Sequence, residues 1–382
     1  MILCHLERVD NSVQFRDTAP QFINPPLAEW LRRNTLVMEN GLNRQGSLSV
    51  TLKSRTGTRK NTPVVLKQIH NDILIGVGPS IFVSPNWQQE VIKYNLAIIP
   101  FYWAYIESTK GVFDFSQQRA IVDWCKARGI RTKAHPVVYN EVLPSWKVTP
   151  VTEEDKTRLV NSIMSAFPDI DYWDVVNEPI HTGVQAKAAY TLASKYSKNL
   201  IVNEYGVLPS DSIGFKTYMA SMPYQVGLQC HIPQNEVWDI NQIVNSVNSY
   251  TDPHISEISI TSARELAGTL LWDEQKQADY VVQLYTALFN SNAKSITWWN
   301  LYDGDPWRPH IGLIKTDGTK KPAYMALTNL LASWKTTSTG VTDNVGTYKF
   351  TGYYGTYEVI VGGRVRGKVV LNETTANGIV TY

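Results

Sequence analysis

Eight short apolar runs, separated by amphipathic stretches, fill the middle of this 382-residue chain. The runs lie at 72–78, 96–102, 131–139, 172–178, 200–205, 225–231, 255–260 and 295–301. Buried strands that alternate with helices over roughly 270 residues are typical of a (β/α)8 TIM barrel, an α/β fold. An open doubly wound sheet would instead need a glycine-rich phosphate turn after its first strand, and the sequence GVGPSIF fits that pattern poorly.

Short alternating runs and turn residues occur on both sides of this zone. We expect a β-rich segment at 1–68, the barrel at 69–336 and a second β-rich segment at 337–382. Because both ends of a barrel domain lie at its surface, the two outer segments are able to pair into one accessory β-sandwich. A structural or attachment role, with contact to an assembly partner, is favoured for this region over carbohydrate binding.

The overall composition argues against several classes of function. Lys and Arg number 36 against 34 Asp and Glu, so the net charge of +2 indicates no bulk attraction to nucleic acid or to membranes. No apolar stretch approaches the length needed to span a bilayer. The N-terminus lacks a basic region followed by an apolar one, so no signal peptide is predicted and the location of the protein stays open.

Metal and cofactor sites are not predicted either. Cys4, Cys125 and Cys230 are too far apart for a CxxC metal site or a disulfide framework. The seven histidines show neither HxH nor HExxH spacing, which argues against a metal-dependent hydrolase.

The 12 Trp and 20 Tyr residues favour a carbohydrate ligand, since flat aromatic faces stack on sugar rings.

Polar residues lie at or just beyond the ends of most of the apolar runs. They are His135, Asn177, Glu178, Asn203, Glu204, Gln229, His231, Glu257, Asn300 and Asp303. Active sites of barrels lie at the C-terminal ends of the strands, where these residues converge. Because unpaired buried polar groups are costly, so many of them exceed what stability requires. The sequence therefore predicts a polar pocket at this end of the barrel.

Two of these residues are carboxylic acids on runs that face each other across the barrel mouth. Glu178 ends the fourth run and Glu257 lies in the seventh. Retaining glycoside hydrolysis uses two carboxyl groups about 5–5.5 Å apart, one to protonate the leaving oxygen and one to attack the anomeric carbon. Either residue alone fits a loop charge or an ion-pair partner, but the pair indicates a retaining glycoside hydrolase.

The neighbouring residues fit this chemistry. Gln229 and His231, which share one face of the sixth run, are expected to hydrogen-bond the carboxylate in the seventh run and keep it ionised. Asn177 is expected to donate to the sugar 2-hydroxyl. Trp299 and Trp307 flank the eighth run, where they are placed to wall the sugar at the scission point.

Seven motifs, in order, resemble those of glycoside hydrolase family 10, the endo-β-1,4-xylanases, over about residues 70–335. They are AHPVVYNEVLPSW (134–146), WDVVNEP (173–179), LIVNEYG (200–206), VGLQCH (226–231), ISEISI (255–260), ITWWNLYDGDPW (296–307) and KKPAYMAL (320–327). The resemblance implies a retaining enzyme that cleaves internal β-1,4 linkages of xylan or a related polysaccharide, and a polymeric substrate implies extracellular action.

The resemblance also implies roles for individual residues. Glu178 corresponds to the acid/base and Glu257 to the nucleophile of the family. The residues implied to bind substrate or support the two acids are His135, Tyr139, Asn177, Asn203, Tyr205, Gln229, His231, Trp299 and Trp307. No metal and no cofactor is implied.

Three departures from the family pattern bear on the substrate. The family has a Glu-Asn pair and a Lys after the second strand, whereas this chain has IIPFYWAYIES there. Ser259 stands where the family has an Asp two residues after the nucleophile, and Tyr139 replaces a usual Trp. Three interpretations stay open: a xylanase, the same chemistry on another polysaccharide such as a β-glucan, and a non-catalytic sugar-binding or structural barrel in a larger assembly.

Overall fold

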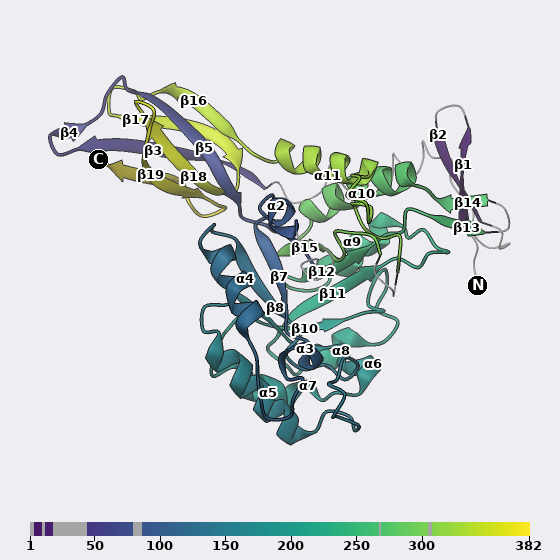
Figure 1. Cartoon of the computed structure of the whole chain (residues 1–382). Helices are drawn as coiled ribbons and strands as arrows, with labels where there is room; N and C mark the ends of the chain where they lie inside the picture. The colour runs from purple at the N-terminus through teal and green to yellow at the C-terminus, as the bar shows by residue number, and fades with distance from the viewer. Residues whose placement is uncertain (1–3, 10–11, 18–43, 79–85, 267–268, 305–307) are drawn as a thin grey trace. The chain divides into compact units, whose positions relative to one another are not determined.

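The computed structural model describes residues 4–9, 12–17, 44–78, 86–266, 269–304 and 308–382 (Figure 1). It divides the chain into two compact units. The first comprises Met1–Asn40 and Ile75–Tyr324, and the second comprises Gly41–Leu74 and Met325–Tyr382. The second unit is therefore assembled from segments that lie on either side of the first in sequence.

The first unit contains a closed barrel of eight parallel strands. Its strands are β6 (Leu74–Val77), β7 (Leu96–Pro100), β8 (Arg131–His135), β9 (Tyr172–Asn177), β10 (Leu200–Glu204), β11 (Gln225–His231), β12 (His254–Ser259) and β15 (Ser295–Trp298). Each lies within or next to one of the eight apolar runs, so the predicted TIM barrel is confirmed. Every residue of β7, β10, β12 and β15 is buried, as expected for parallel strands covered on both faces.

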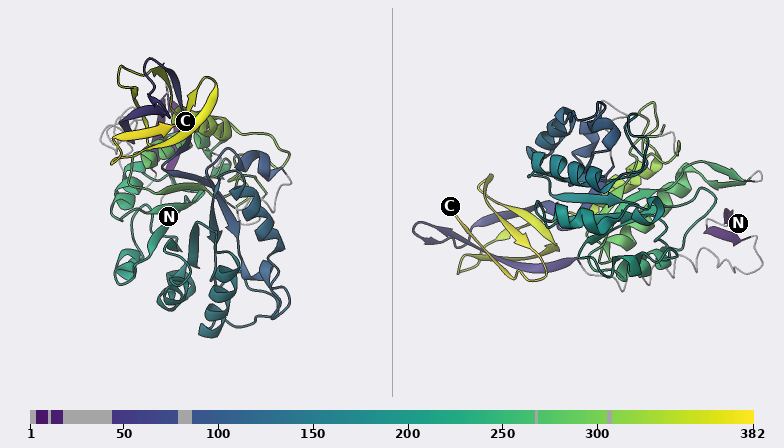
Figure 2. Two further views of the ribbon diagram at one scale, coloured as in Figure 1. Left: turned by 90° about the vertical axis from the view of Figure 1, so that its left-hand side faces the viewer. Right: turned by 90° about the horizontal axis from the view of Figure 1, so that it is seen from below.

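Helices follow most of these strands and surround the barrel (Figures 1 and 2). They are α2 (Trp87–Val91), α3 (Trp103–Ile106), α4 (Ser116–Lys126), α5 (Glu153–Ala166), α6 (Pro179–Thr182), α7 (Ala186–Ala193), α8 (Phe215–Met219), α9 (Ile240–Asn248) and α10 (Glu274–Phe289). A further helix, α11 (Pro322–Ser333), begins in the first unit and continues into the second. The start of α5 is fixed by a capping box, in which Thr152 and Asp155 satisfy each other's backbone N–H groups. None of the described helices is both long and apolar enough to cross a bilayer.

Two short hairpins also belong to the first unit. One joins β1 (Cys4–Val9) to β2 (Ser12–Asp17), and the other joins β13 (Arg264–Leu266) to β14 (Thr269–Trp272). The first hairpin lies in the segment expected to belong to the accessory region, but it groups with the barrel unit. The boundary expected at residue 68 falls inside a strand of the second unit, and the one expected at 336 lies eleven residues after the unit begins at Met325.

The second unit is a β-sandwich of two antiparallel-dominated sheets. Its strands are β3 (Gln45–Ser54), β4 (Gly57–Thr58), β5 (Pro63–Asn71), β16 (Thr337–Val341), β17 (Thr347–Tyr353), β18 (Gly355–Val361), β19 (Arg364–Leu371) and β20 (Asn377–Thr381). β5 lies between β16 and β18, and β3 lies between β17 and β20. The two β-rich outer segments thus pair with each other, as the sequence predicts for an accessory sandwich.

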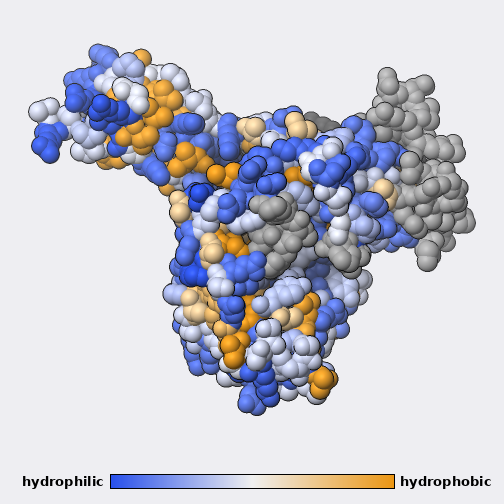
Figure 3. Space-filling model, viewed as in Figure 1, coloured by the Kyte–Doolittle hydropathy of each residue, from blue (hydrophilic) through white to orange (hydrophobic). Residues whose placement is uncertain are grey.

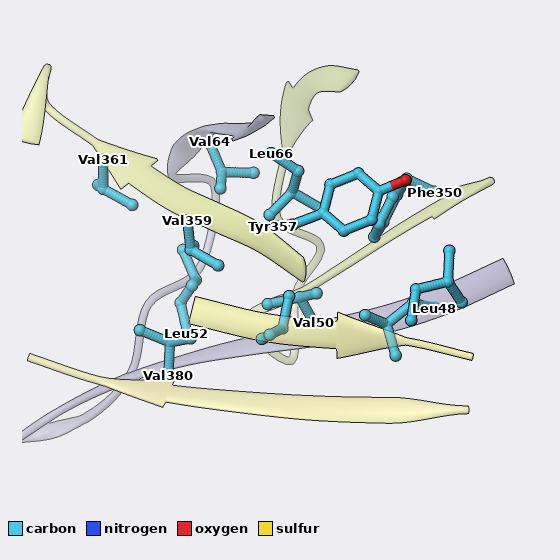
Figure 4. Packing of buried hydrophobic residues seen from close by; sticks show 12 residues of the cluster. Leu48, Val50, Leu52, Val64, Leu66, Phe350, Tyr357, Val359, Val361 and Val380 are labelled. Carbon is cyan, nitrogen blue, oxygen red and sulfur yellow. The ribbon is translucent and has the colours of Figure 1, made fainter. Parts of the chain in front are cut away.

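Alternating side chains build the core of this sandwich (Figure 4). β3 directs Leu48, Val50 and Leu52 inward, and β18 directs Tyr357 and Val359 inward from the other sheet. The alternate positions of the two strands are partly or fully exposed. On the visible surface of this unit, hydrophobic residues gather in one area with hydrophilic residues around it (Figure 3). This period-two pattern is the signal that identified both segments as β-structure.

Candidate active site

The predicted polar residues lie at the C-terminal ends of the barrel strands. β8 ends at His135, β9 at Asn177 and β10 at Glu204, while β11 ends at His231. Parallel pairing sets Gln229 opposite Glu257 and Asn203 opposite Asn177 on adjacent strands. Hydrogen bonds connect six of the predicted residues, which are Asn177, Glu178, Asn203, Gln229, His231 and Glu257.

Glu178 lies directly after β9 in an unusual backbone conformation. Its φ of 52° and ψ of 51° are left-handed, a region that costs a non-glycine residue on the order of 1 kcal/mol or more. Its N–H donates to Asn203 O at 2.7 Å, and its carbonyl accepts from Thr182 N at 2.9 Å. Pro179 follows as the first residue of α6, where a missing N–H has no consequence. The chain therefore turns sharply at Glu178, and this turn fixes the position of the backbone from which its side chain projects.

Two side chains hold the Glu178 carboxyl group. The Tyr139 hydroxyl donates to Oε2 and the Gln229 amide donates to Oε1, both at 2.9 Å. Burial raises the pKa of Glu178, and the negative charge of Glu257 raises it further. Hydrogen bonds from Gln229, Tyr139 and Asn177 act in the opposite direction. The net result is a carboxyl group that keeps its proton to higher pH than an ordinary glutamic acid.

Glu257 has the opposite tendency. The residue is only 4% exposed, and burial alone would raise its pKa. His231 Nε2 lies 3.0 Å from Oε2 and Asn203 Nδ2 donates to Oε1 at 2.6 Å, while His135 Nε2 lies 3.8 Å from Oε1. The hydrogen bond from His231 and the charges of His135 and His231 outweigh burial and lower the pKa of Glu257. This carboxylate stays ionised.

A chain of amide groups joins the two acids. Asn177 Oδ1 accepts from Asn203 Nδ2 at 2.8 Å and from Gln229 Nε2 at 3.4 Å. A Cβ on the neighbouring Gly227 would lie 2.6 Å from Asn203 Oδ1, so the Asn203 amide needs glycine at this position. The expectation that Gln229 bonds the carboxylate of β12 is wrong. Both oxygens of that group already have partners on β10 and β11, and the Gln229 amide extends to Glu178 instead.

A buried charged group lies behind His135 and was missed in the sequence. Asp174 Oδ2 lies 2.9 Å from His135 Nδ1 and 2.9 Å from Lys133 Nζ. Asp174 and Lys133 have 0% and 1% exposed side chains. Burial would raise the pKa of Asp174, but the charge of Lys133 and the His135 hydrogen bond lower it overall. The sequence did contain a signal for this group, because Lys133 and Asp174 are charged residues inside two apolar runs. Charged residues are rarely buried without partners, so the two could have been expected to pair.

Two predicted residues lie beside this network. Trp299 is 9% exposed, and its ring meets His135 edge-on at 4.9 Å between centroids. Tyr205 is 40% exposed and stacks on His181 at 3.5 Å, while His181 Nδ1 lies 2.7 Å from the buried carboxylate of Glu204. An exposed ring with a fixed orientation is suited to stack against a sugar.

Tyrosines occupy the segment after β7, where the family pattern has polar residues. The Tyr102 ring lies 5.7 Å from Tyr105, 5.7 Å from His135 and 6.5 Å from Tyr139, measured between centroids. Tyr105 is 57% exposed. The sequence showed that the family's polar residues are absent from this segment. It did not show that aromatic rings cluster beside His135 in their place.

The remaining predicted residues are arranged differently. Trp307 lies outside the described residues. Asp303 accepts from Gly312 N at 2.8 Å and pairs with the buried Lys321 at 2.7 Å, so its carboxylate is used in local structure. The Asn300 carbonyl accepts from Trp298 Nε1 at 2.8 Å. Within the described part of the chain, no three His, Cys, Asp or Glu side chains are grouped to hold a metal ion.

Comparison with protein families gives one match to this barrel. The family model described as Glycosyl hydrolase family 10 matches residues 100–208 and 215–330. The matched segments cover more than half of the chain. They include β8 to β15 and every predicted site residue from His135 to Trp307.

Two relatives illustrate the similarity at the sequence level. Anti-sigma-I factor RsgI6 from Acetivibrio thermocellus is 24% identical over 288 residues, which cover 70% of this chain and 37% of that protein. Endo-1,4-beta-xylanase A from Caldicellulosiruptor sp. is 25% identical over 304 residues, which cover 65% of this chain and 44% of that protein. The chain thus spans about two fifths of the length of these relatives.

Solved structures share the fold. Xylanase 10B from Thermotoga maritima superposes with a TM-score of 0.57 at 17% identity, over 69% of this chain and 95% of that one. A structure described as GH10 from Paenibacillus barcinonensis gives a TM-score of 0.56 at 19% identity, over 68% of this chain and 95% of that one. The part of this chain left outside both superpositions is close in size to the sandwich unit together with the N-terminal segment.

Proposed function

The chain belongs to glycosyl hydrolase family 10, and from this premise we propose that it is a retaining hydrolase that cleaves internal β-1,4 linkages of xylan or a related polysaccharide. In this proposal Glu178 is the general acid/base and Glu257 is the nucleophile. The observation that carries it is the opposite effect of the surroundings on the two acids, which raise the pKa of Glu178 and lower that of Glu257. A retaining mechanism requires this pair of states, one acid protonated and the other ionised.

The first step of the proposed reaction forms a covalent intermediate. Glu257 attacks the anomeric carbon as a carboxylate, while Glu178 gives its proton to the departing glycosidic oxygen. Asn203 and His231 hold the two oxygens of Glu257, which keeps the attacking group in one orientation. Asn177 is proposed to contact the 2-hydroxyl of the sugar, where a hydrogen bond strengthens in the transition state.

In the second step Glu178 changes from general acid to general base. Now ionised, it removes a proton from water, and the water oxygen attacks the anomeric carbon and releases Glu257. The hydrogen bonds from Tyr139 and Gln229 support Glu178 in this ionised form. Each hydrolysis leaves Glu178 protonated again and Glu257 ionised, so the site returns to its starting state.

The substrate preference rests on the surface around the two acids. Tyr102, Tyr105 and Tyr139 form an aromatic cluster. The first two follow β7, where the family pattern has a Glu-Asn pair and a Lys, and Tyr139 follows β8, where the family has a Trp. Stacking on sugar rings replaces part of the hydrogen bonding to hydroxyl groups in such a subsite. This supports a related β-1,4-linked polymer, including a β-glucan, as an alternative substrate to xylan.

A sugar-binding barrel without turnover is the second candidate function. One relative is named as an anti-sigma factor and not as an enzyme. Ser259 also stands where the family has an Asp, next to the histidine that holds Glu257. Against this candidate, a barrel that only binds sugar has no need of two acids with opposed protonation states.

The sandwich unit is proposed to have a structural or attachment role, with an assembly partner as its ligand. Its strands come from both outer segments of the chain, so it forms a separate module around its own core. A polymeric substrate outside the cell implies that the barrel acts there.

Product analysis tests the proposed function. The wild type and Glu257→Ala are incubated with xylan, β-glucan and other β-1,4-linked polymers, and the anomeric form of the first products is followed by NMR. Oligosaccharides that first appear in the β-form from the wild type, with none from Glu257→Ala, are the expected result. Products of inverted configuration would overturn the mechanism. A folded wild type that binds oligosaccharides and cleaves no polymer would favour the second candidate.

A further inference from the structure

The Tyr139 hydroxyl lies between two carboxyl groups. It is 2.9 Å from Glu178 Oε2 and 3.2 Å from Glu141 Oε2. A phenol carries one proton, so it donates to only one of the two carboxylates at a time. Glu141 is solvent-exposed, whereas Glu178 is partly buried. The tyrosine therefore connects the proposed acid/base to a second acid that exchanges protons directly with water.

The segment that carries Tyr139 and Glu141 is fixed to the neighbourhood of Glu178. Val138 bridges to Val176 of β9, and Asn140 Nδ2 donates to Thr182 O at 3.0 Å. Asn140 Oδ1 also accepts from Val151 N at 2.7 Å. Asn140 thus fastens this segment to α6, the helix that begins next to Glu178, and its two neighbours are held close to the acid.

We propose that Tyr139 is a positioning residue that couples the protonation of Glu178 to that of Glu141. Two arrangements are possible with one shared proton. In the first, protonated Glu141 donates to the Tyr139 oxygen, whose own proton is donated to ionised Glu178. In the second, Glu178 is protonated and donates to Tyr139, which donates to ionised Glu141. One proton moves from Glu141 to Tyr139 as another moves from Tyr139 to Glu178, so no charge is created on the tyrosine.

This coupling fits the two demands that the proposed function, on which it rests, makes of Glu178. The acid must be protonated in the first step and ionised in the second. Two other groups act on its protonation: the charge of Glu257 favours its protonated form until Glu257 becomes an ester in the covalent intermediate, and Gln229 stabilises its ionised form. Tyr205 lies close enough to Glu178 and Glu141 for their charges to raise its pKa. The carboxylate of Glu204 is hydrogen-bonded to His181. Tyr139 and Glu141 add a second adjustable influence, one that does not depend on the covalent intermediate.

The signs of the expected effects are opposite for the two residues. The Tyr139 hydroxyl stabilises ionised Glu178, so Tyr139→Phe should raise the pKa of Glu178, by about one pH unit. The charge of Glu141 disfavours ionised Glu178 and competes for the hydroxyl, so Glu141→Gln should lower the same pKa. In the Tyr139→Phe background, Glu141→Gln should shift it less, because the competition for the hydroxyl is absent.

The test is a carbon-13 NMR titration of glutamate side-chain carboxyl groups in the full chain. Spectra of the wild type, Tyr139→Phe, Glu141→Gln and the double variant are compared, and the Glu178 signal is assigned with Glu178→Gln. Tyr196→Phe, which removes a hydroxyl bonded to Asn161, and Glu154→Gln, which removes an exposed charge on α5, are the matched controls. Neither control should move the Glu178 titration.

The outcomes separate this proposal from the proposed function. An unchanged or lowered pKa of Glu178 in Tyr139→Phe would overturn the positioning role. Equal shifts by Glu141→Gln with and without the tyrosine hydroxyl would overturn the coupling, since Glu141 would then act by charge alone. The titration needs no substrate, so it gives a result even where no polymer is cleaved. Where turnover is found, the basic limb of kcat/KM should move in the same direction as the titration.

Discussion

Glu257 lies inside a barrel strand, whereas Glu178 lies one residue past the end of another, and the surroundings of the two acids differ accordingly. The Glu257 half of the site consists of Glu257, His135, Asn203 and His231, all on strands. The Glu178 half consists of Glu178, Tyr102, Tyr139 and Glu141, all in segments that follow strands. In the first half, His231 alone is partly exposed and the other three residues are buried. This half resembles the family pattern at each of its four positions, while the second half contains the tyrosines that depart from it.

This contrast separates reaction chemistry from substrate choice. Barrel strands pair with neighbours on both sides, so a residue within them has little freedom to move or to be exchanged. The segments beyond the strand ends tolerate replacement, and in barrel enzymes they commonly vary while the scaffold stays the same. We expect changes in the Glu257 half to affect every substrate, and changes in the Glu178 half to depend on the substrate.

The largest effect is expected for Glu257→Ala. Without the attacking carboxylate no glycosyl-enzyme forms, so kcat should fall by roughly 10⁵-fold or more on polymers and on activated aryl glycosides alike. Steady-state rates on both substrate types measure this. A variant that retained most of its activity on either type would remove Glu257 from its proposed role.

Glu178→Ala should discriminate between substrates. Its loss on the natural polymer should be about 10²–10⁴-fold, the usual contribution of general acid catalysis. An aryl glycoside with a good leaving group needs no proton in the first step, so the glycosyl-enzyme should still form and accumulate. Pre-steady-state release of the aryl group measures this, and equal losses on both substrates would contradict the assignment.

The pH profile should reflect both halves of the site. Activity requires ionised Glu257, whose pKa is lowered, so the rate should fall only below the ordinary glutamate range. It also requires protonated Glu178, whose pKa is raised, so the rate should fall again above that range. Each limb of kcat/KM should change about tenfold per pH unit. In Glu178→Ala, the rate of glycosyl-enzyme formation from an activated substrate should no longer fall at high pH, because the group whose loss of a proton causes that fall is absent.

The sequence predicted the Glu257 half better than the Glu178 half, for a physical reason. Strand ends follow from apolar periodicity, and parallel strands place their ends together, so His135, Asn203, His231 and Glu257 could be grouped in advance. Side-chain partners beyond the strands depend on loop conformation, which has no such period. The contacts of Tyr139 with Glu178 and Glu141 therefore became evident only in the structure.

The rest of the fold shows the same limit. Alternation identified β3 and β18 as strands, but it did not determine that β3 lies between β17 and β20. Pairing partners separated by about three hundred residues or more leave no local pattern in the sequence. Gln229 was placed on the correct face of β11 and assigned to the wrong acid. Which acid it bonds depends on how many donors Glu257 already has.

Asp174→Asn tests the support behind the Glu257 half. It leaves the buried Lys133 without its ionic partner, so the free energy of unfolding should fall by about 3–5 kcal/mol. The matched change Asp169→Asn breaks the half-exposed pair with Arg119 and should cost about 1 kcal/mol or less. Urea unfolding followed by tryptophan fluorescence reports mainly the barrel, because Trp334 is the single tryptophan in the sequence of the sandwich unit. Equal losses for the two variants would show that the buried group does not hold this half together.

The smallest effect is expected for Ser259→Ala, at the one departure from the family pattern beside the Glu257 half. The Ser259 hydroxyl lies 2.9 Å from His231 Nδ1, while Nε2 holds Glu257. The Ser259 hydroxyl thus gives Nδ1 a hydrogen-bond partner, which holds the ring with Nε2 toward Glu257. Its removal should lower kcat/KM by about 2–10-fold, the value of one neutral hydrogen bond, equally on all substrates.

Ser295→Ala provides the matched control for this last change. Ser295 Oγ lies 2.9 Å from Nδ1 of the buried His254, so the two serines make the same contact at the C-terminal and N-terminal ends of neighbouring strands. Both variants lose one such hydrogen bond, and both should lose about 1 kcal/mol of stability. Only Ser259→Ala should lower kcat/KM, because only its histidine holds Glu257. Equal losses of kcat/KM in the two variants would mean that Ser259 acts through the stability of the barrel. The serine in place of the family's Asp would then have no effect on the chemistry of the Glu257 half.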